Sequence, residues 1–183
     1  MIKKFLDLGM QPLANKYLTK KDIIKKNKEQ FYHLEVGFNS KTKLVSIINT
    51  VPSKKMFDGN YPYKSSMSQT MKLSFKKLAK NLIKTYNPNS ILEIGSNDGP
   101  FIRNFSKKKV ICVEPCKNLA IITKRMGYKT YVSFWNMRLA KKIKSKTEKV
   151  ELIYSANTLS HISNLNSVFR SIDYILSDEG ILI

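Results

Sequence analysis

The residues best suited to chemistry in this sequence surround a glycine turn at 93–99. The run Glu93-Ile94-Gly95-Ser96-Asn97-Asp98-Gly99 follows an apolar, strand-like segment, and its two glycines allow a ligand to approach the backbone closely. We expect a helix to begin near Pro100, so that its free N–H groups face the same turn. Because one glycine of a dinucleotide-binding fingerprint is missing, a diphosphate ligand is weakly supported. Glu93 and Asp98 instead fit a cationic ligand that resembles an amino acid.

A second carboxylate follows at Glu114, directly after the apolar run that ends at Val113. It lies about 20 residues beyond the turn, the spacing at which a carboxylate can accept hydrogen bonds from both hydroxyls of a ribose. A glycine turn with acidic residues, followed by such a carboxylate, indicates S-adenosylmethionine as the cofactor. The alternative interpretation is an ordinary strand–helix turn with a surface glutamate.

Asn157 and His161 follow a third apolar run. Since the carboxyl ends of parallel strands face the ligand crevice, we expect both residues beside the cofactor. A histidine titrates near neutrality and is a candidate general base, although a lone histidine at a loop–helix junction is more often a structural cap. The segment lacks the Asn/Asp-Pro-Pro-aromatic stretch with which DNA and RNA amino-methyltransferases hold a base, which counts against a nucleic-acid substrate.

The elements that must position these residues alternate between strand and helix. Apolar residues recur at three- and four-residue steps from Met67 to Tyr86, which predicts a long amphipathic helix capped by Ser66 or Ser68 and ended by Asn87-Pro88. Strand-like runs and helices then alternate, which predicts an α/β fold with a parallel, doubly wound sheet. The expected strands are 90–94, 110–113, 130–132, 151–156 and 180–183, and further helices begin near Pro100, Lys117, Asn136 and Leu165.

Residues 1–64 form a region of different character. A hairpin is expected from 34–38 and 43–48, and a short helix from 22–29. The region is too small to bury much core alone, so we expect a small β-rich N-terminal module at 1–64 before a cofactor-binding domain at 65–183. Because the last strand stops after three apolar residues, we expect that domain to be incomplete at its C-terminus.

Composition and charge limit the class of protein. Of 183 residues, 42% are hydrophobic and 25% charged, as in globular proteins. No apolar run approaches the roughly 18–20 residues of a membrane span, and no secretory signal is recognisable, so we expect a cytoplasmic protein. The net charge of +20 attracts polyanions, but only four of 33 basic residues are arginine. We interpret the scattered lysines as solvated surface, with a nucleic-acid face as the alternative.

Four stretches of the chain, in order, resemble the sugar C-methyltransferases of deoxysugar biosynthesis, which methylate a carbon of a nucleotide-linked keto-deoxyhexose. They are LDLGMQPLAN at 6–15, YPYKSS at 61–66, EIGSNDG at 93–99 with VEP at 113–115, and ANTLSHI at 156–162. The resemblance implies a class I S-adenosylmethionine-dependent methyltransferase with a Rossmann-like sheet, here truncated after the fifth strand. It also implies a small-molecule partner, a nucleotide sugar, rather than nucleic acid or a membrane.

The resemblance further implies roles for particular residues. In the family, a base removes a proton next to a ketone and the enolate attacks the methyl group, which needs a base, an oxyanion partner and a dry site. His161 matches the family's histidine, as base or positioning group, and Tyr61 and Tyr63 match its tyrosine pair. Without the family, those tyrosines are an aromatic turn. The expected cofactor contacts are Gly95, Asn97, Asp98 and Gly99 for the methionine part, with Glu93 flanking the turn, Glu114 for the ribose, Phe134 and Asn136 for the adenine, and Asn157 beside the cofactor.

The sequence departs from the family in its cysteines and its length. The family opens with a zinc domain that holds two Cys-x-x-Cys pairs, and neither pair is present here, so we predict no metal and a module without zinc. Cys112 and Cys116 are expected to be buried and inert. The family's chain also continues into a second α/β domain. A non-catalytic cofactor-binding remnant is therefore one alternative function, and the net charge of +20 gives an RNA-directed methyltransferase as another.

Overall fold

The computed structural model describes residues 2–24 and 29–183. By internal contacts the chain divides into two compact units, Met1–Met56 and Phe57–Ile183, which we call unit 1 and unit 2. Residues 57–64, which the sequence analysis assigned to the N-terminal module, group with unit 2. The division into a small β-rich module and a cofactor-binding domain after residue 64 stays a prediction.

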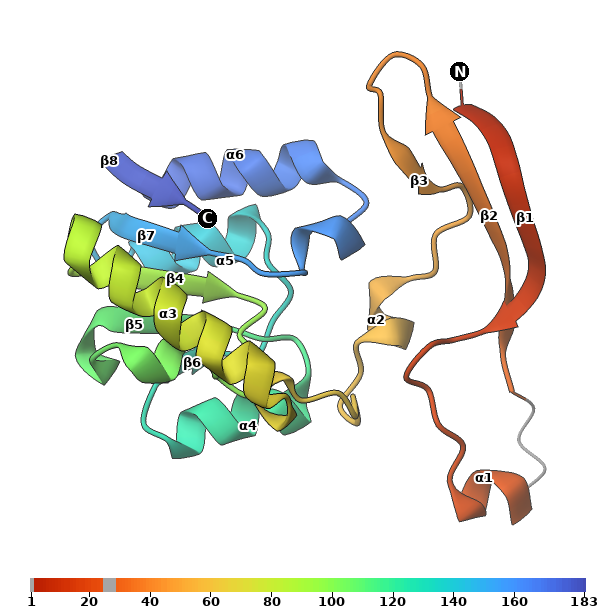
Figure 1. Ribbon diagram of the computed structural model, residues 1–183, viewed down its shortest axis with the longest axis horizontal. Helices are drawn as coiled ribbons and strands as arrows, with labels where there is room; N and C mark the ends of the chain where they lie inside the picture. The colour runs from red at the N-terminus through yellow and green to blue at the C-terminus, as the bar shows by residue number, and fades with distance from the viewer. Residues whose placement is uncertain (1, 25–28) are drawn as a thin grey trace. The chain divides into compact units, whose positions relative to one another are not determined.

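Unit 1 contains a three-stranded antiparallel sheet in the order β1-β2-β3 (Figure 1). β1 (Ile2–Pro12) pairs with β2 (Phe31–Asn39), which pairs with β3 (Val45–Ile47). The predicted hairpin between β2 and β3 is confirmed, and the Asn39 side-chain oxygen accepts hydrogen bonds from backbone N–H groups in its turn. The described residues of the unit also form two short helices, α1 (Lys20–Ile24) and α2 (Ser53–Met56). Part of the helix predicted at 22–29 lies outside the described residues.

β1 was not predicted as a strand, because its sequence does not alternate between polar and apolar residues. The pairing with β2 shifts register twice, between Lys4 and Leu6 and between Asp7 and Met10, and Gly9 has a positive φ of 66°. Each irregularity changes which residues share a face of the strand, so the two-residue period of an ordinary strand is lost.

Unit 2 contains a five-stranded parallel sheet in the order β6-β5-β4-β7-β8, which confirms the predicted α/β class (Figure 1). The strands are β4 (Ile91–Ile94), β5 (Val110–Val113), β6 (Lys129–Tyr131), β7 (Val150–Tyr154) and β8 (Leu176–Leu182). The chain runs outward from β4 through β5 to β6, and then returns to β7 on the other side of β4. In open sheets of this kind, the carboxyl ends of the strands at such a reversal form the ligand crevice.

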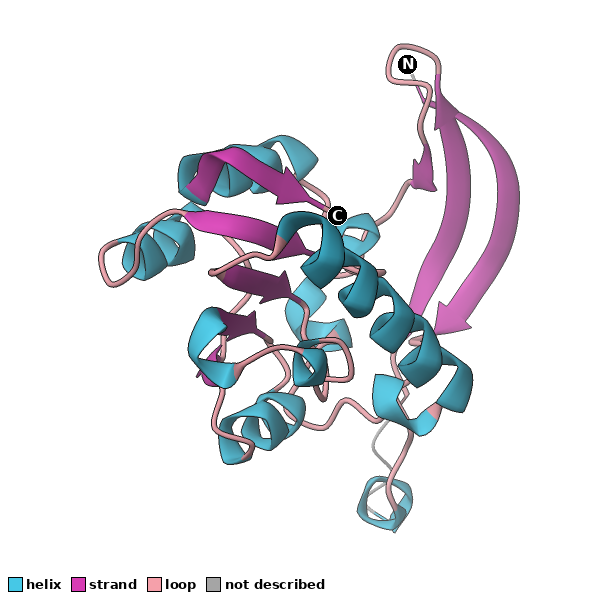
Figure 2. Cartoon of the chain, turned by 60° about the vertical axis from the view of Figure 1, so that its left-hand side comes forward, coloured by secondary structure: helices cyan, strands magenta, loops and turns pink. Residues whose placement is uncertain are grey.

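Helices cover both faces of this sheet (Figures 1 and 2). Helix α3 (Gln69–Tyr86) packs on one face, in an apolar cluster that includes Ile91 and Leu152. Helices α5 (Met137–Lys144) and α6 (Leu165–Ile175) pack on the other face, in a cluster that includes Leu92 and Ile153. Neighbouring strand residues therefore point to opposite cores, as the alternation of side chains along a strand requires.

Polar side chains cap the ends of helix α3. Its N-terminal cap is Ser68, one of the two serines predicted from the sequence. Ser68 accepts a hydrogen bond from the Met71 N–H at the start of α3, while Asn87 ends that helix in the left-handed conformation. Helix α4 (Lys117–Arg125) is followed by Gly127 with a φ of 90°.

The helix predicted near Pro100 is wrong. The chain forms only two short 3₁₀ turns there, η2 (Ile102–Asn104) and η3 (Lys107–Lys109). The Asn104 side-chain amide donates to the carbonyls of Pro100 and Phe101, which an α-helix would use for its own N–H groups. The turn after β4 is therefore not followed by an α-helix N-terminus.

No helix among the described residues is long and apolar enough to cross a membrane.

Candidate functional site

The glycine turn after β4 depends on left-handed backbone conformations. Gly95 and Gly99 have φ values of +79° and +85°, and Asn97 between them has a φ of 48°. A Cβ atom on Gly95 would lie 2.2 Å from the Thr158 Oγ1 atom, so this position has no room for a side chain. The Gly95 N–H donates to the Val113 carbonyl at 2.8 Å, which joins the turn to the end of β5.

Three carboxylates, Glu93, Asp98 and Glu114, are buried around this turn. The two oxygens of Glu114 accept hydrogen bonds of 2.8 Å from the N–H groups of Asn97 and Cys116. Burial nevertheless raises the pKa of Glu114. The pKa of Glu93 is raised well above its ordinary value, by burial first and then by the charges of Glu114 and Asp98. The Glu93 Oε2 atom has no hydrogen-bond partner among the described residues.

The side chains of Asn97 and Asp98 hold a segment of residues 57–66, which we call the strap. The Ser65 N–H donates to Asn97 Oδ1 at 2.9 Å, and Asn97 Nδ2 donates to the Tyr63 carbonyl at 3.2 Å. Asp98 accepts from both the N–H and the hydroxyl of Ser66. Four hydrogen bonds thus fasten the end of the strap to the glycine turn.

The strap also brings Tyr61 and His161 to a shared aromatic neighbour. The ring of Phe57 lies 5.4 Å from that of Tyr61 and 5.6 Å from that of His161, measured between centroids, with both pairs tilted. The Asn118 side chain of α4 donates to the Tyr61 carbonyl at 2.8 Å. His161 and Tyr63 remain exposed, so both can meet a substrate from solvent.

The remaining predicted residues lie after β6 and β7. Asn136 caps helix α5 by accepting from the Leu139 N–H at 2.9 Å, and its amide donates to the Phe134 carbonyl. Phe134 is half-buried and Asn136 is exposed. Asn157 is exposed in a left-handed conformation with a φ of 51°. The hydrogen bonds of Asn136 therefore serve the local structure rather than joining the carboxylates.

Cys112 and Cys116 are free and buried, as expected. Burial raises the pKa of Cys112 to about 12 and also raises that of Cys116, so both remain thiols at neutral pH.

Sequence reasoning missed several residues that shape this site. Phe57 and Asn118 were not recognised, because neither belongs to a motif of recognisable spacing. Thr158 lies in the quoted ANTLSHI stretch but was not singled out. Ser65 and Ser66 lie in the quoted YPYKSS stretch, but nothing in the sequence indicated that they bind Asn97 and Asp98, 32 residues away.

The parallel sheet, its strand order and the loops that carry the carboxylates define the class I methyltransferase fold. The family model described as "Methyltransferase domain" matches residues 63–183, and the chain belongs to that family. A second family model, described as "Putative zinc binding domain", matches residues 1–57.

The chain is also similar to individual proteins. It is 22% identical over 181 residues to the C-methyltransferase NovU of Streptomyces niveus, which covers 96% of this chain and 42% of NovU. Among solved structures, the plantazolicin methyltransferase BpumL with a desmethylPZN analogue and SAH has a TM-score of 0.51 at 16% identity, covering 72% of this chain and 52% of BpumL. The plantazolicin methyltransferase BamL has a TM-score of 0.50 at 16% identity, covering 64% and 47%. The chain thus spans about half or less of these relatives.

Proposed function

We propose that this chain carries the S-adenosylmethionine site of a methyltransferase. The observation that supports it best is the set of buried carboxylates at the glycine turn, in a chain that belongs to a methyltransferase family. The cofactor carries an ammonium and a sulfonium, so a buried carboxylate without a cationic partner suits it. Glu93 would face the amino end of the cofactor and Glu114 the ribose.

Asn97 and Asp98 serve this site indirectly in the proposal. Their side chains are occupied by Tyr63, Ser65 and Ser66, so they act as positioning residues for the strap. The backbone at Gly95 and Gly99 would lie against the cofactor. Phe134, Asn136 and Asn157 would border its adenine end from the loops after β6 and β7.

For the methyl acceptor, we propose a carbon next to the ketone of a nucleotide-linked keto-deoxysugar. The similarity to the C-methyltransferase NovU and the YPYKSS stretch support this choice. His161 would accept the proton from that carbon, and the hydroxyls of Tyr61 and Tyr63 would hold the enolate oxygen. The enolate carbon then forms a bond to the methyl group as the bond from methyl to sulfur breaks. Phe57, between Tyr61 and His161, would keep the two side chains on one side of the sugar.

Calorimetric titration with S-adenosylhomocysteine tests the cofactor site. We expect Glu114→Ala to weaken binding roughly 10- to 100-fold, the effect of losing a charge-assisted hydrogen bond or two to the ribose. Glu179→Ala, at an exposed glutamate of β8, is the matched control and should bind as the unaltered chain does. Unchanged affinity in a folded Glu114→Ala variant would show that the ribose lies elsewhere. Tight, salt-sensitive binding of RNA without affinity for S-adenosylhomocysteine would contradict the proposed function.

A further inference from the structure

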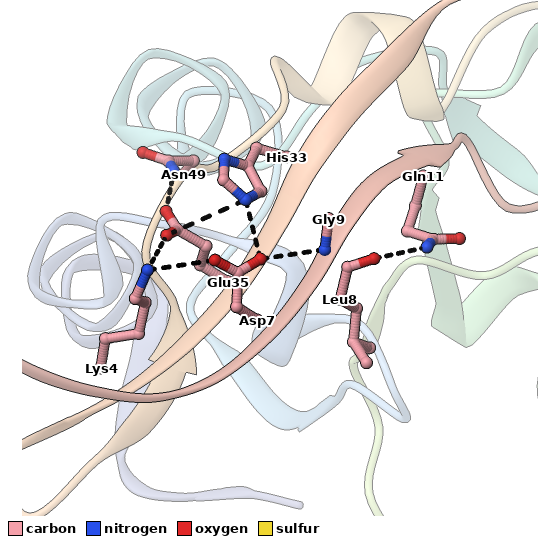
Figure 3. Close-up of polar contacts among 8 residues, drawn as sticks. All are labelled: Lys4, Asp7, Leu8, Gly9, Gln11, His33, Glu35 and Asn49. Carbon is pink, nitrogen blue, oxygen red and sulfur yellow. Dashed lines mark hydrogen bonds and ion pairs between the residues drawn. The ribbon is translucent and has the colours of Figure 1, made fainter.

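Unit 1 matches a family described as zinc binding, yet its sequence lacks cysteine, the common ligand of structural zinc. The two cysteines of the chain stand at 112 and 116, outside residues 1–57. Among the described residues, Asp7, His33 and Glu35 form a group whose metal-ligating atoms all lie within 4.8 Å of one another (Figure 3). These three side chains come from the paired strands β1 and β2.

This group does not fit a structural zinc site. Such sites are closed by four ligands, mostly cysteine and histidine, whereas the described part of the unit brings three ligands together here. A cation already lies between the two carboxylates: the Lys4 Nζ atom is 2.6 Å from Glu35 Oε1 and 3.1 Å from Asp7 Oδ2. A metal bound to both carboxylates would have to displace this ammonium.

The strand register explains why the two carboxylates need a cation and why Lys4 lies beside them. Asp7 and Glu35 stand directly opposite each other in the β1–β2 pair, and like charges in that arrangement repel. Lys4 lies three residues before Asp7, a separation that normally puts two side chains on opposite faces of a strand. The register shift between Lys4 and Leu6 adds one residue to β1, so Lys4 and Asp7 reach the same face.

Every carboxylate oxygen in this cluster has a partner. Asp7 Oδ1 accepts from the Gly9 N–H at 2.9 Å and lies 2.8 Å from His33 Nε2, while Glu35 Oε2 accepts from the Asn49 side chain at 2.6 Å. The contacts with Glu35 and Asp7 raise the pKa of Lys4, which keeps the ammonium charged. The Gly9 N–H, then His33 and Lys4, lower the pKa of Asp7.

We propose that the Lys4 ammonium, a cation supplied by the chain itself, takes the place of a bound metal in unit 1. It joins the two strands through Asp7 and Glu35, and Asn49 extends the network to the segment after β3. Unit 1 then keeps its sheet without zinc, and Lys4 masks a latent site made of Asp7, His33 and Glu35. This inference is independent of the cofactor site in unit 2.

Hydrogen exchange of the β1 and β2 amides in the whole chain, together with its metal content by mass spectrometry, tests the proposal. In the unaltered chain, we expect exchange to be the same with and without EDTA after expression in zinc-supplemented medium. In Lys4→Met, we expect roughly two- to five-fold faster exchange, the effect of losing exposed ion pairs, and a new ability to bind Zn²⁺ by calorimetry. Lys3→Met removes an exposed neighbouring lysine and is the matched control.

Two results would overturn the proposal. One zinc per unaltered chain, with protection of β1 and β2 lost on adding EDTA, would show that a metal holds the unit. A Lys4→Met variant that exchanges like the unaltered chain and gains no affinity for Zn²⁺ would show that the ammonium has no such role. Because the EDTA comparison uses the unaltered chain, it stands even where Lys4→Met does not fold.

Discussion

Carboxylates gather in both units of the chain, but the two clusters have opposite surroundings. In unit 1, Asp7 and Glu35 share the Lys4 ammonium, and each of their oxygens has a partner. In unit 2, Glu93, Asp98 and Glu114 are buried, and no ammonium or guanidinium of the described residues forms an ion pair with them. A structural network satisfies its own charges, whereas a binding site leaves charge for its ligand to satisfy. The comparison therefore distinguishes a cluster whose carboxylates pair with an ammonium from a buried cluster whose carboxylates do not.

The same two units differ in how they are stabilised. Unit 2 has apolar clusters on both faces of its sheet, built from fully buried residues such as Leu152 and Ile153. Among the described residues of unit 1, only Gly37 is buried, while Phe5, Met10 and other large apolar side chains are exposed. Burial of apolar surface therefore contributes much of the stability of unit 2, and the sheet and its polar network carry a larger share in unit 1.

The largest expected effect tests this difference in stabilisation. Leu152→Ala removes a fully buried side chain of β7, between Ile91 and Ile181, and should lower the free energy of unfolding by about 2–5 kcal/mol. Val45→Ala, at an exposed residue of β3, should change it by less than about 0.5 kcal/mol. Urea unfolding, followed by the fluorescence of Trp135, measures the first variant, and hydrogen exchange of β2 measures the second. Equal losses of free energy of unfolding in the two variants would contradict the conclusion that apolar burial stabilises unit 2 more than unit 1.

A second prediction concerns the strap, whose bonds to the glycine turn link the candidate substrate and cofactor residues. Ser66→Ala removes the hydroxyl that donates to Asp98, and should weaken the local closure of the strap by about 1.5–3 kcal/mol, as for a hydrogen bond to a charged group. We expect the amides of Ser65, Ser66 and Met67 to exchange faster by roughly ten-fold or more. Ser65→Ala keeps the N–H that binds Asn97 and should exchange as the unaltered chain does. Similar exchange in both variants would show that the Ser66 hydroxyl does not anchor the strap to Asp98.

The sequence predicted the parts of this molecule that follow from local pattern. The parallel sheet and α3 follow from apolar periodicity, and the polar ends of β4 and β5 follow from residue type and spacing. The strap could not be predicted, because its bonds join residues 32 positions apart through backbone groups that every sequence contains. Neither could the bulge in β1, which alone makes Lys4 and Asp7 neighbours. The helix expected after Pro100 does not form, and the Asn104 side chain donates there to the carbonyls of Pro100 and Phe101, a competition that apolar periodicity does not reveal.

A third prediction uses the buried carboxyl groups of unit 2. Because the pKa of Glu93 is raised, the folded chain keeps a proton that the unfolded chain releases above about pH 4.5. Stability should therefore fall as pH rises between the unfolded and the folded pKa, by at most about 1.4 kcal/mol per pH unit for this group. Glu93→Gln cannot ionise and should lose this part of the slope, which urea unfolding from about pH 5 to about pH 8 measures. Glu179→Gln should keep it, and parallel curves for all three proteins would refute a buried, protonated Glu93.

The smallest expected effect lies in the satisfied cluster of unit 1. A double-mutant cycle of Lys4→Met and Glu35→Gln should give only a small coupling free energy at about 0.1 M salt, because the Lys4 side chain is exposed to solvent. Hydrogen exchange of the β1 and β2 amides measures it. As the Debye length falls from about 10 Å to about 3 Å at 1 M salt, the coupling should shrink, while the cost of Leu152→Ala should not. A coupling that persists at high salt would mean that hydrogen-bond geometry, rather than charge, joins Lys4 to Glu35. The Lys4 ammonium would then act as an ordinary hydrogen-bond donor in the sheet. Such a result would contradict the proposal that its charge takes the place of a metal ion.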